Sequence, residues 1–152
     1  MSDYERLIVV AFGLGALALF VKSYIEITRK KNPYGKFDWG IIYGGFVYAD
    51  YLVFGAFWAT AAFVINFLND FLLFLLTFSV FWLIRSIGES LYWFLQQFST
   101  LVHKNPPQRF LIYRIIKSDA VWFVNQIIWQ CLTVIFVITT IYLGSLWIAK
   151  IF

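Results

Sequence analysis

Long runs of apolar residues occupy most of the chain, and short polar segments separate them. The runs cover Leu7–Ile27, Ile41–Leu68, Phe71–Phe98 and Ala120–Ala149. Each has the roughly 20 residues that a helix needs to cross a hydrocarbon layer about 30 Å thick. The pattern predicts four transmembrane helices in an all-α integral membrane protein. Because the connections are short, we expect an antiparallel four-helix bundle that forms one membrane domain over residues 1–152.

Turn-forming residues mark the breaks between these runs. The first connection contains the sequence NPYG at residues 32–35, and the third contains NPP at residues 105–107. Helices rarely tolerate such residues internally. The second connection is only Asn69-Asp70, which predicts a tight hairpin between the second and third helices.

Basic residues are concentrated in the first and third connections. The first holds Arg29, Lys30, Lys31 and Lys36, and the third holds Lys104, Arg109, Arg114 and Lys117. The positive-inside rule therefore predicts that loops 28–40 and 99–119 are cytoplasmic and that both termini lie on the other side. The N-terminal leader MSDYER is acidic on balance, and lysines and arginines follow the first apolar run. This order is typical of a retained membrane anchor, not of a cleaved signal peptide.

Residues 108–117 have an amphipathic pattern of their own. At 100° per residue, Arg109, Arg114 and Lys117 fall on one side and four aliphatic residues fall on the other. Such a segment suits a short interfacial helix on anionic lipid headgroups at the cytoplasmic face. A solvated connector whose apolar residues pack on the bundle fits the pattern equally well.

Composition narrows the class of protein further. The chain is 62% hydrophobic and 13% charged, with a net charge of +4. The basic residues lie in short loops between apolar runs, so they indicate membrane orientation and not nucleic-acid binding. The single cysteine, Cys131, and the single histidine, His103, cannot form an intrachain disulfide or a Cys/His metal cluster. We therefore expect no metal and no cofactor.

The third apolar run carries a narrow polar stripe. Arg85 and Glu89 are four residues apart, so they share one face of a helix and can pair. Tyr92 and Gln96 extend this face within a stripe about 60° wide. Charges exposed to lipid at depth cost several kcal/mol, so the stripe is expected to face protein or water.

Polar residues on the second and fourth runs are predicted to lie in the same layer of the membrane. Asp50 lies about nine residues inside the second run, a depth of about 13 Å. The fourth run contributes Gln126, Gln130 and Thr133 on one face, with Asn125 to the side. We expect Arg85 to bridge Asp50 and Glu89 in a buried triad. This cluster would bind a ligand or an ion, or it would serve as interhelical glue.

Small residues are frequent on the second run. They are Gly44, Gly45, Ala49, Gly55, Ala56 and Ala59. Small residues at helical spacing allow two backbones to approach closely. They predict that the second helix is the centre of the bundle or a seam between copies of the chain.

These features favour a non-catalytic subunit of a homo- or hetero-oligomeric membrane complex. The alternative is a small ion- or proton-coupled transporter or channel that uses Asp50, Arg85 and Glu89. A membrane enzyme acting on lipid, with Glu89 or Asp50 as general base, has less support, because no nucleophile or metal signature accompanies these carboxylates.

Overall fold

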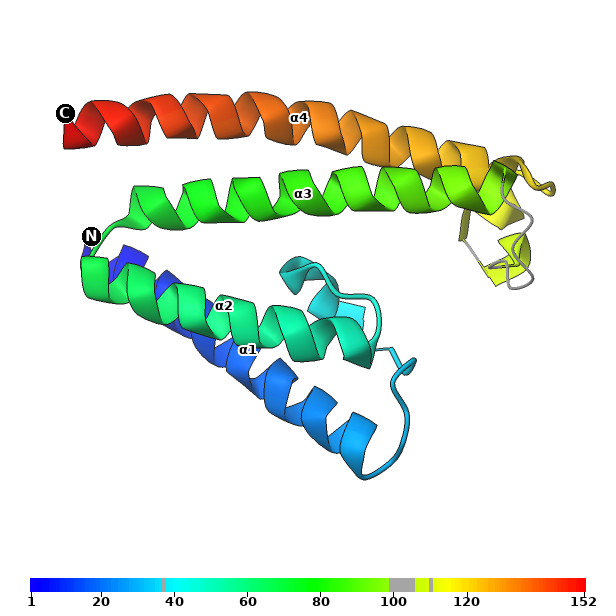
Figure 1. Ribbon diagram of the computed structural model, residues 1–152, viewed down its shortest axis with the longest axis horizontal. Helices are drawn as coiled ribbons and strands as arrows, with labels where there is room; N and C mark the ends of the chain where they lie inside the picture. Colours follow the sequence, from blue (N-terminus) through cyan, green and yellow to red (C-terminus); the bar gives the residue numbers. More distant parts are fainter. Residues whose placement is uncertain (37, 99–105, 110) are drawn as a thin grey trace. The chain divides into compact units, whose positions relative to one another are not determined.

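The computed structural model describes residues 1–36, 38–98, 106–109 and 111–152. Four long helices dominate them: α1 (Asp3–Thr28), α2 (Tyr48–Leu68), α3 (Phe71–Phe98) and α4 (Ala120–Ile151) (Figure 1). Each is long and apolar enough to cross a membrane. The described residues contain no strand. The chain divides into two compact units, Met1–Leu75 and Leu76–Phe152. His103 and Lys104 lie outside the described residues.

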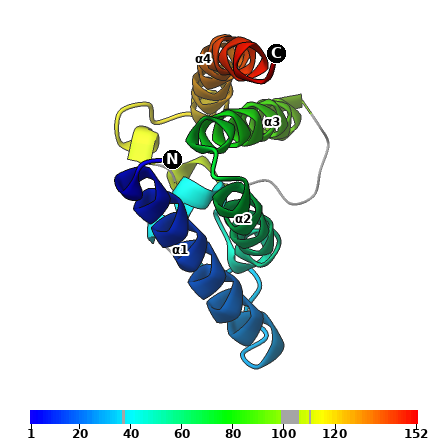
Figure 2. The ribbon, with the colours of Figure 1, turned by 90° about the vertical axis from the view of Figure 1, so that its left-hand side faces the viewer.

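The helices α1 and α2 form a close antiparallel pair in the first unit (Figures 1 and 2). A Cβ atom on Gly13 would come within 2.7 Å of the Ala62 Cβ, and one on Gly55 within 2.9 Å of the Ala16 carbonyl oxygen. These contacts leave no space for larger side chains. The expectation that small residues of the second helix allow close approach is therefore confirmed at Gly55, whereas Ala56 is exposed.

One apolar core cluster of this unit lies at the end where α2 passes into α3. Val9, Ala62, Ile65 and Phe74 are buried there. The turn that closes this end is tight, as predicted, because Asn69 adopts the left-handed conformation (φ 56°). The Asp70 carboxylate then accepts hydrogen bonds from the backbone N–H groups of the first turn of α3. The turn at Asn69 and the Asp70 carboxylate thus satisfy backbone groups that the ends of α2 and α3 would otherwise leave unpaired.

The second helix begins later than the apolar run predicts. Residues Asp38–Tyr43 form the 3₁₀ helix η1, and α2 starts only at Tyr48. Gly44 has φ 81°, a left-handed conformation that glycine adopts without strain and that ends η1. The predicted helix from Ile41 is therefore wrong before Tyr48.

The η1 segment folds back into the first unit. The Tyr43 hydroxyl donates a hydrogen bond to the Phe12 carbonyl oxygen (3.2 Å), 16 residues before the end of α1 at Thr28. The aromatic ring of Tyr51, on α2, covers both Gly40 and Gly45, where an added Cβ would lie 2.4 and 2.3 Å from ring atoms. Gly40, Tyr43 and Gly45 therefore pack against α1 and α2, while Trp39, Ile41 and Ile42 are exposed.

The loop before α2 also satisfies the first backbone groups of that helix. The N–H of Tyr48 donates to the Gly35 carbonyl oxygen (3.0 Å), and the N–H of Ala49 donates to the Pro33 carbonyl oxygen (3.1 Å). A helix start that is inserted among apolar side chains needs such partners, because its N–H groups have none within the helix.

The helices α3 and α4 run antiparallel in the second unit. Three hydrogen-bonded contacts show this: Ser79 with Thr140, Ser86 with Thr133, and Gln97 with Gln126. As the residue numbers rise along α3, those of their partners on α4 fall. In the connection between these helices, residues 107–109 and 111–114 form the short 3₁₀ helices η2 and η3. A continuous interfacial helix over 108–117 is therefore not formed by the described residues.

The packing of Tyr51 on Gly45 provides a test of how the segment before α2 is held. We expect Gly45→Ala to lower the free energy of unfolding by about 1–3 kcal/mol, because the new methyl group overlaps the buried ring. Thermal unfolding of the protein in detergent micelles measures this change.

Gly88→Ala, in α3, is the matched control. No described atom lies within 4 Å of an added Cβ there, so the variant should match the parent protein or gain up to about 1 kcal/mol from helix propensity. Equal stability of the two variants would contradict the proposed packing of Gly45.

Candidate functional site

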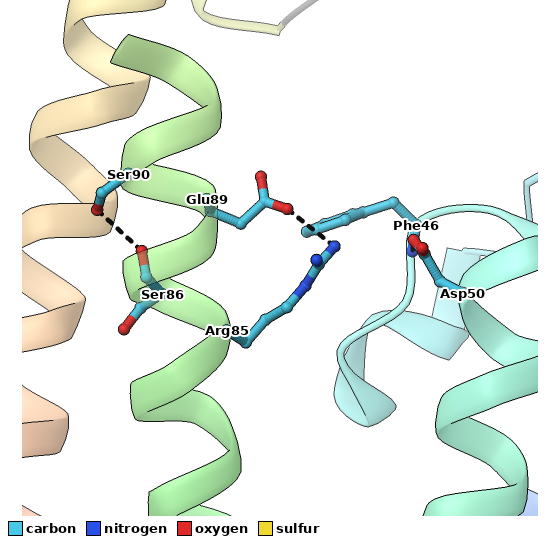
Figure 3. Close-up of polar contacts among 6 residues, drawn as sticks. All are labelled: Phe46, Asp50, Arg85, Ser86, Glu89 and Ser90. Atoms are coloured by element: carbon cyan, nitrogen blue, oxygen red, sulfur yellow. Dashed lines mark hydrogen bonds and ion pairs between the residues drawn. The ribbon is translucent and has the colours of Figure 1, made fainter. Parts of the chain in front are cut away.

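The most prominent polar feature of the spans is an ion pair within α3. Arg85 Nη2 lies 2.8 Å from Glu89 Oε1, and the two side chains are 20% and 11% exposed (Figure 3). Both residues lie near the middle of the 28-residue helix α3, and they are separated by about one helical turn. The pairing expected from the four-residue spacing is therefore present.

The pairing lowers the cost of placing charge in an apolar helix. A single charged side chain at the centre of a bilayer costs roughly 2.5–3.5 kcal/mol or more. Because guanidinium and carboxylate share a charge-assisted hydrogen bond, the two residues form a neutral unit. On the same face, Gln96 is buried, and the ring of Tyr92 meets that of Trp93 edge-on at 5.1 Å.

A different face of α3 carries hydroxyl groups that reach α4. The Oγ of Ser79 lies 2.8 Å from the Oγ1 of Thr140, and Thr133 Oγ1 donates to Ser86 Oγ at 2.9 Å. Both serines are buried. The partners are seven residues apart on each helix, the repeat that keeps one seam facing a neighbouring helix. We call Ser79, Ser86, Thr133 and Thr140 the hydroxyl ladder.

Sequence reasoning missed three members of the hydroxyl ladder, namely Ser79, Ser86 and Thr140. The available signal was their seven-residue spacing on two antiparallel helices. It was overlooked because serine and threonine do not interrupt an apolar run as charged residues do.

The amides of α4 have partners other than the charged pair. Gln126 Oε1 accepts a hydrogen bond from Gln97 Nε2 at 2.6 Å, near the end of α3. Asn125 donates to the Val121 carbonyl oxygen of its own helix (2.9 Å). Gln130, which was expected to be buried in the cluster, is exposed.

Aromatic stacking adds to the contact between α3 and α4. The ring of Trp82 stacks on Trp129 with centroids 6.5 Å apart and an interplanar angle of 11°. It also stacks on Phe136 at 6.1 Å and 15°. These rings therefore pack the helix pair and extend the seam marked by the hydroxyl ladder.

Asp50 has a local role at the start of α2. It is not nine residues inside a helix, as predicted, but in the first helical turn, because α2 begins at Tyr48. Its Oδ2 accepts a hydrogen bond from the Phe46 N–H at 2.9 Å (Figure 3). A carboxylate in this position satisfies the helix start and interacts favourably with the helix dipole.

The predicted triad of Asp50, Arg85 and Glu89 spans two units of the chain. Asp50 belongs to Met1–Leu75, and the ion pair belongs to Leu76–Phe152. The arginine–glutamate pair is formed within α3, and its bridging to Asp50 stays a prediction.

The residues expected at the membrane surface lie in and beside the short 3₁₀ helices. Arg109 ends η2, Arg114 ends η3, and Lys117 follows in the connection to α4. Arg114 and Lys117 are exposed. Among the described residues, no group of three or more His, Cys, Asp and Glu side chains could hold a metal ion.

Comparisons with protein-family models, curated proteins and solved structures gave no match.

Removing the charges of Arg85 and Glu89 tests whether the two residues stabilise the protein as a pair. We expect Arg85→Met and Glu89→Gln, made singly, each to cost about 3 kcal/mol of unfolding free energy, because each leaves the remaining side chain without its ion-pair partner. The double variant should recover most of this loss, since both charges are gone. Unfolding in mixed detergent micelles measures the cycle.

Arg114→Met is the control for loss of one positive charge at an exposed site, and it should change stability by less than about 0.5 kcal/mol. Additive losses in the Arg85–Glu89 double variant, with no recovery, would show that the two residues do not act as a pair.

Proposed function

We propose that the protein is a non-catalytic, multi-pass subunit of a homo- or hetero-oligomeric membrane complex. The observation that carries this proposal is the local pairing of polar side chains. All three polar contacts lie within one unit: the Arg85–Glu89 pair forms within α3, while the hydroxyl ladder and the Gln97–Gln126 contact join α3 to α4. Interhelical hydrogen bonds of this kind hold membrane helices together.

The outward surface of the helices also supports the proposal. None of the residues in the most apolar 18-residue stretch of α4 is buried, and Ile138, Ile141 and Tyr142 are each more than 60% exposed. A helix that packs on one neighbour leaves most of its circumference for lipid or for other helices. Such apolar faces suit association within a membrane, where small and apolar side chains pack against a partner.

The proposal includes an orientation. The basic residues of loops 28–40 and 99–119 support a cytoplasmic position for these connections, with both termini on the opposite side.

A second candidate is a small ion- or proton-coupled transporter or channel. The observation that favours it is the low exposure of Glu89, whose side chain is only 11% exposed midway along a helix of membrane-spanning length. Ionisable residues in such positions are candidates for ion or proton pathways. In this version Asp50, Arg85 and Glu89 form the pathway, and several copies of the chain enclose it.

Reconstitution into liposomes separates the two candidates. For a non-catalytic subunit, we expect proton and potassium fluxes equal to those of protein-free liposomes. We also expect native mass spectrometry of the detergent-extracted protein to give a mass above that of one 17.8 kDa chain.

The control is the double variant Arg85→Met with Glu89→Gln. A flux that the parent protein supports and this variant abolishes would overturn the subunit proposal in favour of transport. A single-chain mass in every mild detergent, without flux, would also contradict the subunit proposal.

A further inference from the structure

The exposed side chain of Gln130, on α4, makes no hydrogen bond to any residue that the structure describes. Every other asparagine, glutamine, serine and threonine side chain of α4 makes one. The bonds to α3 come from Gln126, Thr133 and Thr140. The bonds to carbonyl oxygens of α4 itself come from Asn125, Thr139 and Ser145. Gln130 therefore differs from all the amides and aliphatic hydroxyl groups that surround it in the helix.

The position of Gln130 along α4 makes the missing partner unfavourable. A helix of 32 residues is about 48 Å long, so it extends about 9 Å beyond each side of a 30 Å hydrocarbon layer on which it is centred. Gln130 lies about 15 Å from the start of α4, and thus about 6 Å inside the layer. Tilt of the helix would place it deeper. Hydrocarbon offers an amide no hydrogen bond, so a partner from protein is expected there.

Gln130 belongs to a stripe of exposed side chains on α4 that repeats every seven residues. We call it the outer stripe, and it consists of Phe123, Ile127, Gln130, Val134, Val137 and Ile141. Steps of four and three residues alternate along it, which is the pattern that lets two helices pack side by side over several turns. Apart from Gln130, the members of this stripe are apolar.

The outer stripe does not compete with the contact between α4 and α3. Each of its inner members directly follows a residue of the α3 contact: Val134 follows Thr133, and Ile141 follows Thr140. One residue is a rotation of about 100° around the helix. The outer stripe therefore faces about a quarter of a turn away from α3, and α4 can contact α3 and a second neighbouring helix at the same time.

A second copy of the chain supplies the group that Gln130 needs. Two copies carry the same basic loops, so they insert into a membrane with the same orientation, and their α4 helices run parallel. In a parallel pair with two-fold symmetry, the members of a seven-residue stripe meet their own equivalents. The two Gln130 side chains then face each other at one depth. A glutamine amide has two N–H donors and a carbonyl acceptor, so it is complementary to a copy of itself.

We propose that the outer stripe of α4 is the interface of a parallel homodimer, in which the two Gln130 amides hydrogen-bond to each other. A single polar residue in a seven-residue apolar repeat fixes the register and the number of helices that associate. The apolar members would pack around the amide pair and exclude lipid from it. This inference rests on the proposed function and narrows it to an assembly of identical chains.

Disulfide cross-linking of the full chain in native membranes tests the interface, in a Cys131→Ser background. Val134→Cys, on the outer stripe, should give a product of twice the chain mass when an oxidant is added, because equivalent positions face each other. Ile135→Cys is the matched control, since Ile135 is 55% exposed and Val134 59%, and the two are adjacent at nearly the same depth. It should give at least fivefold less product.

The role of the amide is tested by the dissociation constant of the dimer, measured as energy transfer between dye-labelled chains that are diluted in phosphatidylcholine vesicles. Gln130→Leu should raise this constant about three- to thirtyfold, the range for one interhelical hydrogen-bonded contact in a membrane. Gln130→Asn, which keeps an amide, should retain most of the affinity. Thr139→Val should have no effect, because the Thr139 hydroxyl is already bonded to the Ile135 carbonyl oxygen at 2.9 Å.

The possible failures of this inference differ from those of the proposed function. An oligomeric mass combined with equal cross-linking of Val134→Cys and Ile135→Cys, or with equal dissociation constants for Gln130→Leu and the parent protein, would overturn the outer stripe as the interface. The subunit proposal would then stand with another contact surface. A single-chain mass in every mild detergent, together with no cross-linked product, would contradict both.

Discussion

Polar groups among these apolar helices need hydrogen-bond partners within the protein, because hydrocarbon offers none. Polar groups at one helix start and along one helix seam meet this constraint locally. At the start of α2, the loop carbonyl groups of Pro33 and Gly35 accept backbone N–H groups, and the Asp50 carboxylate accepts the N–H of Phe46. Between α3 and α4, hydroxyl groups pair at seven-residue intervals. Helix starts and helix seams are thus stabilised by the same kind of interaction.

Hydrophobic runs predicted most helix limits closely, and the third helix was confirmed as Phe71–Phe98. They failed before Tyr48, because an apolar run does not distinguish an α-helix from a 3₁₀ helix and a loop that pack on neighbouring helices. The deciding features were the left-handed conformation of Gly44 and the cover that Tyr51 gives to Gly40 and Gly45. Both depend on tertiary contacts. For the same reason, Asp50 was placed too deep along its helix.

The candidate site was predictable where the chemistry is local to one helix. A four-residue spacing was sufficient to pair Arg85 with Glu89. Partners on different helices depend on rotation and register, which one sequence does not specify. Gln126 therefore pairs with Gln97 and not with the charged residues. These polar contacts join the helices, while the exposed apolar faces of α1 and α4 remain for lipid or other helices.

The central claim is that α3 and α4 pair in one antiparallel register set by the hydroxyl ladder. Disulfide cross-linking in native membranes tests it most directly, in a Cys131→Ser background. With cysteines in place of Ser86 and Thr133, whose oxygens lie 2.9 Å apart, an oxidant should cross-link the helices. The register-shifted pair with cysteines in place of Ser86 and Thr140 should not react. Equal cross-linking of both pairs, or reaction of the shifted pair alone, would contradict the account.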